Sequence, residues 1–373
     1  MKAIARTLKA LEAGGNLRHI PDQGNGRAID LSSNDYLGIS ADDDLRRDFL
    51  RTLTADTFLM TSSASRLLAA PQRDYQRLEE FLEKLYGRPA LLFNSGYHAN
   101  TGMVGALGGK DVLFLADKLV HASIIDGLML AGSDFKRFRH NDLAHLSTLL
   151  SKYGPAYSRV VIVAESVYSM DGDRCDIDGL IDAKKLHPDV LLYIDEAHAV
   201  GVCGPQGLGL AAGRDGVDIL VGTLGKALAS AGAFAILSPL LRQFMVNRCR
   251  SLIFSTAIPP VQAAWSMVTI RRALEMDAER QRLRDIAARL AQALSTAERP
   301  ASPSHIMPYI VGDAARTVSL SAQLLEQGVK VLPIRTPTVP AGTERLRISL
   351  SAALTPQQTE HAAAVFLTLT AKV

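Results

Sequence analysis

The sequence has few cysteines and lacks a long apolar run. It contains 3 cysteines in 373 residues, Cys175, Cys203 and Cys249, which are far apart, odd in number and without the spacing of metal ligands. Such usage is typical of a reducing compartment, so we expect a cytoplasmic protein without a metal site. The sequence has no run of about 18 apolar residues, so we do not expect a membrane-spanning helix. The stretch Met1–Leu11 carries basic residues and lacks the apolar core of a signal peptide.

A dominant charge of one sign is also absent. Lysine and arginine number 41 and aspartate and glutamate 38, which gives a formal net charge of +3. Both signs are interspersed, which argues against electrostatic binding to nucleic acid or to a membrane surface. The composition is 47% hydrophobic, and a chain of this length can bury the core of one large domain and of a smaller second one.

From residue 90 onward, continuous β-rich apolar runs alternate with helical patterns. This order is typical of a mainly parallel sheet covered by helices on both faces. The expected strands are Ala90–Phe93, Val112–Ala116, Phe135–Phe138, Val160–Ala164, Val190–Ile194, Ile219–Val221 and Ala233–Leu237. One long helix over about Val261–Leu294 and a separate α+β unit are expected next. We therefore predict an N-terminal segment (residues 1–40), a large domain (41–270) and a small C-terminal domain (271–373).

A lysine after a glycine-containing turn is the first candidate catalytic residue. The expected strand Ile219–Val221 runs into a turn with glycine at positions 222 and 225, and glycine tolerates positive φ. Lys226 ends this turn among small residues. Poor solvation disfavours the ammonium form and lowers the pKa of a lysine, which makes its amine a nucleophile for a carbonyl carbon. A solvated loop lysine is the alternative interpretation.

Two further polar residues follow the expected strand Val190–Ile194. Asp195 lies at its carboxyl end, where open α/β sheets bind ligands, and a carboxylate there can keep a ring nitrogen protonated. His198 lies three residues later, within reach of the same ligand. The sequence Asp-Glu-Ala-His is also a signature motif of ATP-driven nucleic-acid remodelers such as helicases. The nearest candidate for the required phosphate loop, Gly222–Ala227, has short glycine spacing and ends in alanine, so that alternative fits poorly.

Other candidates lie where expected strands and helices meet. Gly96 and Tyr97 follow a strand and open a helix, whose N–H groups suit a phosphate, although a plain β–α turn is the alternative. His121 lies at a helix start, where it could stack on a flat ring or serve as a capping or core residue. Glu165 and Ser169 flank the end of another strand.

Two arginines alternate with apolar residues near the C-terminus. The strand period of two puts Leu346, Ile348 and Leu350 on the core side, so Arg345 and Arg347 share the other face. An arginine there can hold a substrate carboxylate with two parallel hydrogen bonds. A solvated strand face is the alternative.

Taken together, these residues resemble the α-oxoamine synthases, a family of fold-type I pyridoxal-phosphate (PLP) enzymes. The resemblance runs over about residues 17–353. The stretches that carry it are Ser32-Ser33-Asn34-Asp35-Tyr36-Leu37-Gly38, His121-Ala122-Ser123, Tyr168-Ser169-Met170-Asp171-Gly172-Asp173, Asp195-Glu196-Ala197-His198, Thr223-Leu224-Gly225-Lys226 and Ser255-Thr256-Ala257-Ile258-Pro259-Pro260. It implies a large domain with a mainly parallel seven-stranded sheet sandwiched by helices, and a smaller C-terminal α+β domain.

The resemblance also implies a role for each matched residue. Lys226 binds the aldehyde carbon of PLP and moves the Cα proton of the substrate, while Asp195 pairs with the pyridine nitrogen. His198 bonds the ring hydroxyl, and His121 stacks on the ring. The other cofactor contacts implied are Gly96, Tyr97, Glu165, Ser169, Thr223, Ser255 and Thr256, of which the last two reach PLP from the second subunit of a homodimer with shared active sites. The substrate contacts implied are Arg18, Asn34, His121, Thr338 and Arg347.

Within the family, the stretch from Arg335 to Arg347 indicates similarity to the members that act in biotin biosynthesis. The reaction implied is the decarboxylative condensation of L-alanine with a pimeloyl thioester of coenzyme A or an acyl carrier protein. Glycine or serine with another acyl thioester is the alternative inside the family. A relative that has lost catalysis is a third possibility, which the presence of Lys226, Asp195 and His198 disfavours.

The sequence departs from the family pattern at three places. A glycine-rich turn is expected before Arg66, where this chain has Thr61–Ser65. Tyr75 and Leu354 stand where many members have histidine. These differences bear on the acyl chain and its carrier rather than on the cofactor.

Overall fold

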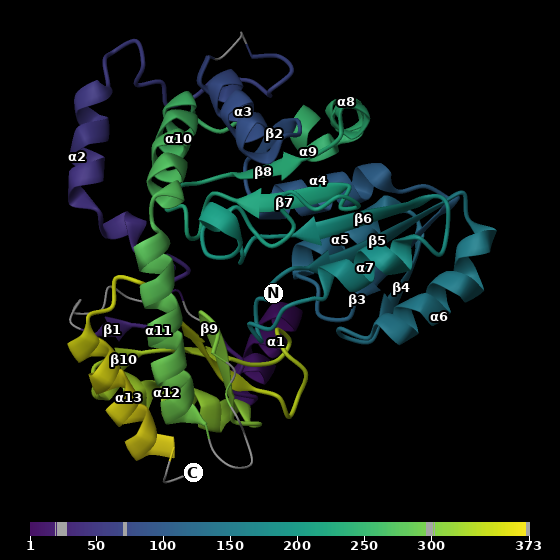
Figure 1. Ribbon diagram of the computed structural model, residues 1–373. Helices are drawn as coiled ribbons and strands as arrows, with labels where there is room; N and C mark the ends of the chain where they lie inside the picture. The colour runs from purple at the N-terminus through teal and green to yellow at the C-terminus, as the bar shows by residue number, and fades with distance from the viewer. Residues whose placement is uncertain (19, 21–27, 70–72, 296–300, 302, 371–373) are drawn as a thin grey trace. The chain divides into compact units, whose positions relative to one another are not determined.

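The structure is a computed structural model that describes the chain except residues 19, 21–27, 70–72, 296–300, 302 and 371–373. It divides into two compact units (Figure 1). The terminal unit comprises Met1–Tyr36, Ser169–Asp173 and Ala278–Val373, and the sheet unit comprises Leu37–Tyr168 and Arg174–Asp277. The three-part division at residues 40 and 270 stays a prediction.

The sheet unit is built on seven strands in the order β2-β8-β7-β6-β5-β3-β4. Strand β8 runs antiparallel to β2 and β7, and the other neighbouring pairs are parallel, which confirms the predicted mainly parallel sheet. The strands are β2 (Ala90–Phe93), β3 (Val112–Asp117), β4 (Asp134–Phe138), β5 (Arg159–Glu165), β6 (Val190–Asp195), β7 (Ile219–Thr223) and β8 (Ala233–Ile236).

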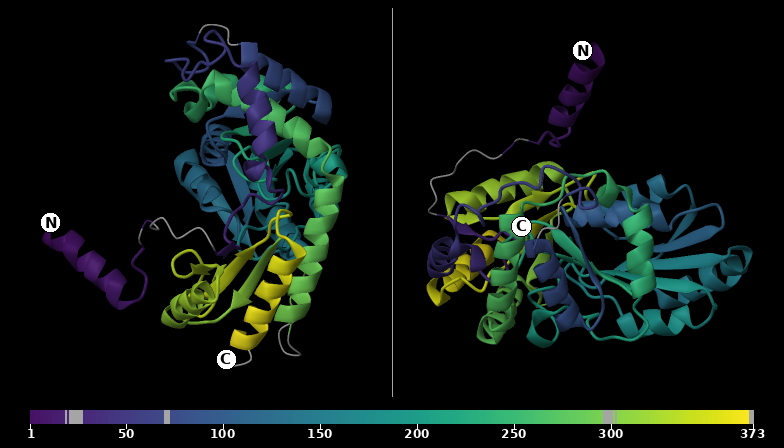
Figure 2. Two further views of the ribbon diagram at one scale, coloured as in Figure 1. Left: turned by 90° about the vertical axis from the view of Figure 1, so that its left-hand side faces the viewer. Right: turned by 90° about the horizontal axis from the view of Figure 1, so that it is seen from above.

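Helices cover both faces of this sheet (Figures 1 and 2). Successive residues of a strand point to opposite faces. Thus Val161 and Val163 of β5 join the cluster that contains Met103 and Ile124, while Val160 and Ile162 are buried on the opposite side. The helices of this unit are α2 (Asp43–Thr52), α3 (Arg73–Tyr86), α4 (Gly96–Leu107), α5 (Ala122–Ala131), α6 (Leu143–Tyr153), α7 (Ile177–Lys184), α8 (Pro239–Arg248), α9 (Arg250–Ile253) and α10 (Pro260–Leu274), with short 3-10 turns η1 (Ile39–Ala41), η2 (Gly154–Ala156) and η3 (Pro205–Gly207).

The terminal unit joins both ends of the chain. Its three-stranded antiparallel sheet has the order β11-β12-β9, and a parallel pair links β1 to β10. Its elements are α1 (Lys2–Ala13), β1 (Ile29–Asp30), α11 (Asp277–Leu294), β9 (Ile306–Ile310), α12 (Ala314–Glu326), β10 (Val329–Lys330), β11 (Leu332–Ile334), β12 (Arg345–Ser349) and α13 (Pro356–Thr370). Of the helices in the described part of the chain, none is long and apolar enough to cross a membrane.

The single long helix expected over Val261–Leu294 is wrong, because the structure has two helices there. Helix α10 ends at Leu274, and α11 begins at Asp277. The N–H groups of Glu275 and Met276 bond to carbonyls three residues back, which tightens the last turn of α10 and ends its α-helical pattern. The helical periodicity continues through this break, so the sequence pattern did not reveal it.

Candidate active site

The turn after β7 presents Lys226 beside a buried histidine. The amine Nζ of Lys226 shares a hydrogen bond of 2.7 Å with Nε2 of His198. The lysine is half-buried, and His198 is almost completely buried. The resemblance had implied a bond from His198 to a ring hydroxyl of the cofactor, whereas in this structure its nitrogen contacts the lysine itself. The predicted nucleophile and an imidazole are therefore neighbours.

The glycines of this turn serve a purpose other than the expected one. Neither Gly222 nor Gly225 has a positive φ; the positive φ values of the turn belong to Ala229, at 44°, and Gly232, at 106°. Gly222 is needed for space, because a Cβ there would lie 2.3 Å from the ring of Phe234. The expected positive φ at 222 and 225 was wrong, since the chain turns later, after Lys226.

Two carboxylates end neighbouring strands of the sheet. Asp195 ends β6, Glu165 ends β5, and the two are paired in register. The Asp195 side chain accepts hydrogen bonds from the N–H of Ala197 at 2.8 Å and from Nδ2 of Asn100 at 2.7 Å. Burial, followed by the nearby charge of Asp195, raises the pKa of Glu165 well above its usual value. The raised pKa favours the protonated form of Glu165, and its Oε1 atom is buried with no hydrogen-bond partner.

His121 precedes helix α5 and caps it. Its Nδ1 accepts the N–H of Ser123 at 3.2 Å, and α5 itself begins at Ala122. Burial lowers the pKa of His121, and the nearby Lys226 lowers it further, against an opposing effect of Asp195. His121 therefore favours the neutral form and lies within electrostatic range of the lysine and the carboxylate. The structure shows the capping role expected as one alternative, and stacking on a flat ring stays a prediction.

The predicted phosphate-binding residues lie around the start of α4. Ser95 caps this helix. Gly96 faces Thr223, because a Cβ added at position 96 would lie 3.9 Å from the Cβ of Thr223. Asn94 joins this end of the sheet to a second segment, since its Nδ2 donates to Ser255 Oγ at 3.3 Å and to the carbonyl oxygen of Thr256 at 2.6 Å.

Tyr97 follows Gly96 and is about half exposed. Its hydroxyl donates to Asp126 of α5. The predicted contacts at residues 96, 97 and 223 thus come from one end of α4 and the end of β7, where free helix N–H groups favour an anion.

Three buried residues of the site were missed by the sequence analysis: Asn100, Ser123 and Tyr193. Nδ2 of Asn100 donates to Asp195 and to Ser123 Oγ, and the hydroxyl of Tyr193 donates to Asn100 Oδ1 at 2.7 Å. Asn100 lies in a helix of mostly small and apolar residues, and a buried amide there must find polar partners. That isolated polar position is the signal that could have revealed it.

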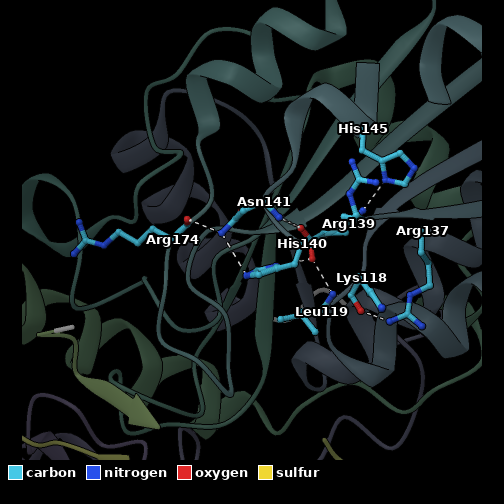
Figure 3. Close-up of polar contacts among 9 residues, drawn as sticks. Lys118, Leu119, Arg137, Arg139, His140, Asn141, His145 and Arg174 are labelled. Carbon is cyan, nitrogen blue, oxygen red and sulfur yellow. Dashed lines mark hydrogen bonds and ion pairs between the residues drawn. The ribbon is translucent and has the colours of Figure 1, made fainter. Parts of the chain in front are cut away.

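A second polar cluster lies at the end of β3 (Figure 3). Asp117 is fully buried and accepts hydrogen bonds from His140 Nδ1 at 2.9 Å, from the N–H of Leu119 at 2.8 Å and from the N–H of Asn141 at 2.9 Å. Burial alone would raise the pKa of Asp117, but these hydrogen bonds outweigh it and lower the pKa. The cluster ties the loop after β4 to the loop that leads to His121.

The helicase-like interpretation of Asp-Glu-Ala-His finds no support. The carboxylate of Glu196 accepts the N–H groups of Leu210 at 2.9 Å and Ala211 at 2.7 Å. Burial raises its pKa to about 7. Glu196 thus anchors a loop of the sheet unit instead of facing a nucleotide.

In the terminal unit, the two arginines of β12 are buried, so the solvated-face alternative is wrong. Arg347 donates from Nε to the carbonyl of Ser169 at 2.6 Å and from both terminal nitrogens to Asn34 Oδ1 at 3.2 Å. Arg345 forms an ion pair with Asp171. Among the described residues, no carboxylate pairs with Arg347, so two neutral oxygens hold its charge.

The terminal unit also contains a pair of neighbouring arginines. A terminal nitrogen of Arg18 donates to Thr338 Oγ1 at 2.8 Å, and one of Arg335 donates to the carbonyl of Leu17 at 2.8 Å. Burial lowers the pKa of Arg335, and the charge of Arg18 lowers it further. Nε of Arg335 and Oδ1 of Asn16 are buried without a partner. Arg335 is a polar residue of this cluster that the sequence analysis did not assign.

Two of the departures from the family pattern, at residues 61–65 and at Tyr75, lie in the sheet unit, and Leu354 lies in the terminal unit. Ser65 forms a bridge with Thr256, and the hydroxyl of Tyr75 donates to the carbonyl of Ile258. The guanidinium of Arg66 lies 4.8 Å from the centre of the Tyr75 ring. Tyr75 therefore ties the start of α3 to the segment that contains Ser255 and Thr256. Leu354 is buried.

A family model confirms the class of protein. The model for aminotransferase class I and II matches residues 27–366, and the chain belongs to this family. Within it, the chain is similar to an 8-amino-7-oxononanoate synthase of Haemophilus ducreyi, with 45% identity over 95% of this chain and 97% of the relative. A putative 8-amino-7-oxononanoate synthase of Pasteurella multocida is 46% identical over 89% of this chain and 88% of its own length.

A solved structure extends the comparison to the cofactor. Serine palmitoyltransferase from S. paucimobilis with bound PLP–myriocin has 27% identity and a TM-score of 0.89, covering 99% of this chain and 97% of that one. The predictions of a fold-type I enzyme, an α-oxoamine synthase and a PLP-dependent acyltransferase are confirmed. The residues of the sheet unit fit PLP, because a lysine amine, a strand-end carboxylate, a helix N-terminus and the unpartnered Oε1 of Glu165 belong to one end of the sheet.

Proposed function

We propose that this protein condenses L-alanine with a pimeloyl thioester, with loss of CO2 and release of the thiol, to form 8-amino-7-oxononanoate in biotin biosynthesis. The named relatives at 45% and 46% identity support this reaction. The observation that carries the chemistry is the 2.7 Å contact between Lys226 and His198, with Asp195 and His121 in the same unit. We assign the protein to the cytoplasm, in keeping with its 3 cysteines.

Each residue of the sheet unit has a proposed task. Bound PLP supplies an electron sink for a carbanion at Cα of the amino acid, which is the difficult part of the chemistry. Lys226 would hold PLP through its amine and would carry the Cα proton. Asp195 would keep the pyridine nitrogen protonated, and its two N–H donors fix the carboxylate for that purpose. His121 would contact the ring, and residues 96, 97 and 223 would hold the phosphate.

Arg347 and Asn34 are proposed to bind the carboxylate of the amino acid. The guanidinium of Arg347 lacks a carboxylate partner among the described residues and is oriented by neutral oxygens of Ser169 and Asn34. A buried cation held in this way favours an incoming carboxylate, because the planar guanidinium can bind both of its oxygens.

Arg18, Arg335 and Thr338 are proposed to bind the acyl substrate. Two neighbouring guanidiniums without a carboxylate partner among the described residues favour an anion. The pimeloyl chain has a free carboxylate at the end remote from the thioester, so these arginines suit its terminal group.

A second copy of the chain is proposed to complete each active site through Ser255 and Thr256. This proposal is supported by large apolar side chains exposed on the sheet unit near the Ser65–Thr256 bridge. These side chains are Phe58, Leu59, Met60, Leu67, Leu68 and Phe254. Exposed apolar groups of this size commonly mark a protein interface.

The test is a thiol-release assay with the purified PLP-bound enzyme. Alanine, glycine and serine are each combined with pimeloyl, palmitoyl and succinyl thioesters. We expect fastest release with alanine and the pimeloyl thioester. Faster release with serine and a long-chain thioester would support the second candidate, which the similarity to serine palmitoyltransferase favours, and would overturn the first.

A further inference from the structure

Two buried side chains, those of Asn100 and Ser123, connect the two groups proposed to contact the PLP ring. Asn100 lies between them: its Nδ2 is 2.7 Å from Asp195 Oδ2 and 2.9 Å from Ser123 Oγ. Ser123 Oγ in turn lies 2.8 Å from His121 Nδ1. Asn100, Ser123 and Asp195 are each at most 4% exposed. An unbroken polar path therefore leads from the carboxylate to the imidazole.

The chemistry of the partners determines how the Asn100 amide is oriented. The carboxylate of Asp195 can only accept, so the NH2 group of Asn100 must face it. The hydroxyl of Tyr193 approaches the other end of the amide, at 2.7 Å from Oδ1, and donates there. A flipped amide would set its oxygen against the carboxylate, at a large cost in a buried site. Both N–H groups of Asn100 are thus committed, one to Asp195 and one to Ser123.

The same reasoning locates the proton of His121. Ser123 Oγ accepts from Asn100, so its own proton is available for His121 Nδ1. The backbone N–H of Ser123 donates to the same nitrogen at 3.2 Å. With two donors directed at it, Nδ1 is unprotonated, and the neutral ring carries its proton on Nε2.

We propose that Asn100 is a positioning residue that orients the Asp195 carboxylate and, through Ser123, holds His121 as the Nε2–H tautomer. The Asn100 amide thereby orients both residues proposed to contact the PLP ring, and Tyr193 fixes the orientation of the amide. This inference rests on the proposed roles of Asp195 and His121 toward PLP. Residues that orient such groups commonly change affinity or activity by about 10- to 100-fold when removed.

The first measurement is the nitrogen-15 NMR spectrum of His121 in the PLP-free protein. We expect the wild type to carry its ring proton on Nε2. In Asn100→Leu, Ser123 can accept instead of donate, so a fraction of His121 with the proton on Nδ1 should appear. Protonation of Nδ1 in the wild type, or an identical tautomer in Asn100→Leu, would overturn the proposal.

The second measurement is cofactor binding and turnover. Asn100→Leu should weaken PLP affinity by about 10- to 100-fold and lower kcat, with KM for the acyl thioester unchanged. Ser123→Ala removes one donor to His121 and keeps the Asn100–Asp195 contact, so it should shift the tautomer and leave PLP affinity within about threefold. Equal loss of PLP affinity in both variants would contradict the separate roles. If Asn100→Leu does not fold, the His121 tautomer in the wild type and in Ser123→Ala still tests the proposal.

A matched control is Ser266→Ala, another fully buried serine of the sheet unit, whose hydroxyl bonds Gln262 and Ser230. It should leave the His121 tautomer and PLP affinity unchanged. Failure of the proposed roles is recognised separately: Asp195→Asn with unchanged PLP affinity would refute the role of Asp195, whereas the tautomer of His121 in the wild type tests the network itself.

Discussion

The two units use charge in opposite ways. In the sheet unit, groups that can gain or lose a proton lie together: Lys226 contacts His198, and Glu165, whose pKa burial raises, lies beside Asp195. In the terminal unit, the arginines proposed to bind substrate are held by neutral oxygens, as Arg347 is by Ser169 and Asn34. Proton transfer needs groups with a shifted pKa, whereas recognition of a carboxylate needs a charge that is always present. The comparison predicts that chemistry and substrate recognition can be damaged separately.

The largest effect is expected for Lys226→Ala. The fold should be kept, because the side chain is only half-buried and its amine contacts His198 rather than the apolar core. The covalent bond to PLP should be lost, and turnover should fall by at least about 10³-fold, because the nucleophile and the proton carrier are removed together. Borohydride trapping, turnover and thermal unfolding measure these effects. Near-normal turnover would refute the role of the lysine.

Two arginines of β12 provide a matched pair for recognition. Arg347→Lys should raise KM for the amino acid by about 10- to 100-fold, because an ammonium cannot replace a planar two-point contact with a carboxylate. Arg345→Lys is the control, since Arg345 is already paired with Asp171. It should alter thermal stability slightly and leave KM unchanged. An equal rise in KM for both variants would remove the distinction between them.

Arg335 tests recognition of the acyl chain. Arg335→Met should reduce kcat/KM for a pimeloyl thioester by about tenfold, corresponding to the loss of one charge-assisted contact. The kcat/KM for a heptanoyl thioester, which has no terminal carboxylate, should change little in the same variant. Ratios of thiol release for the two thioesters measure the effect. A uniform loss with both substrates would assign Arg335 a structural role.

The smallest effect is expected for Glu165→Gln, and it depends on pH. Burial raises the pKa of Glu165 in the folded protein above its unfolded value near 4.5. Wild-type stability should therefore fall as pH rises above about 4.5, by at most about 1.4 kcal/mol per pH unit from this group. The glutamine variant should lose that dependence, so its relative stability should increase with pH. Unfolding of the PLP-free proteins at pH 4.5–8 measures this, and parallel stability curves would contradict it.

Local sequence patterns were sufficient to predict a helix or strand where the cause of that structure is itself local. Helix α3 (Arg73–Tyr86) has apolar residues that repeat with helical spacing, so its formation follows from a local pattern. The strands of the sheet were located because continuous apolar runs are typical of buried parallel strands. By contrast, the break between α10 and α11 has no local signal, since the helical repeat continues across it.

The contacts within the candidate site could not be predicted in the same way. Asn100 and Asp195 are 95 positions apart, and Arg347 and Asn34 are 313 apart. No periodicity records which oxygen will meet which nitrogen over such distances. The residues with chemical function were identified from their type and their place at strand ends. Their supporting partners became evident only from the packed chain.

The sequence by itself determined the class of protein, because ordered stretches such as Asp195-Glu196-Ala197-His198 and Thr223-Leu224-Gly225-Lys226 resemble the α-oxoamine synthases, and this resemblance needs no coordinates. Only the tertiary structure decided that the pKa of Glu165 is raised, that Arg345 pairs with a carboxylate while Arg347 does not, and that Asn100 joins Asp195 to His121. The reason is physical: burial and the identity of hydrogen-bond partners set the charge and orientation of a side chain, and both arise when distant segments pack together.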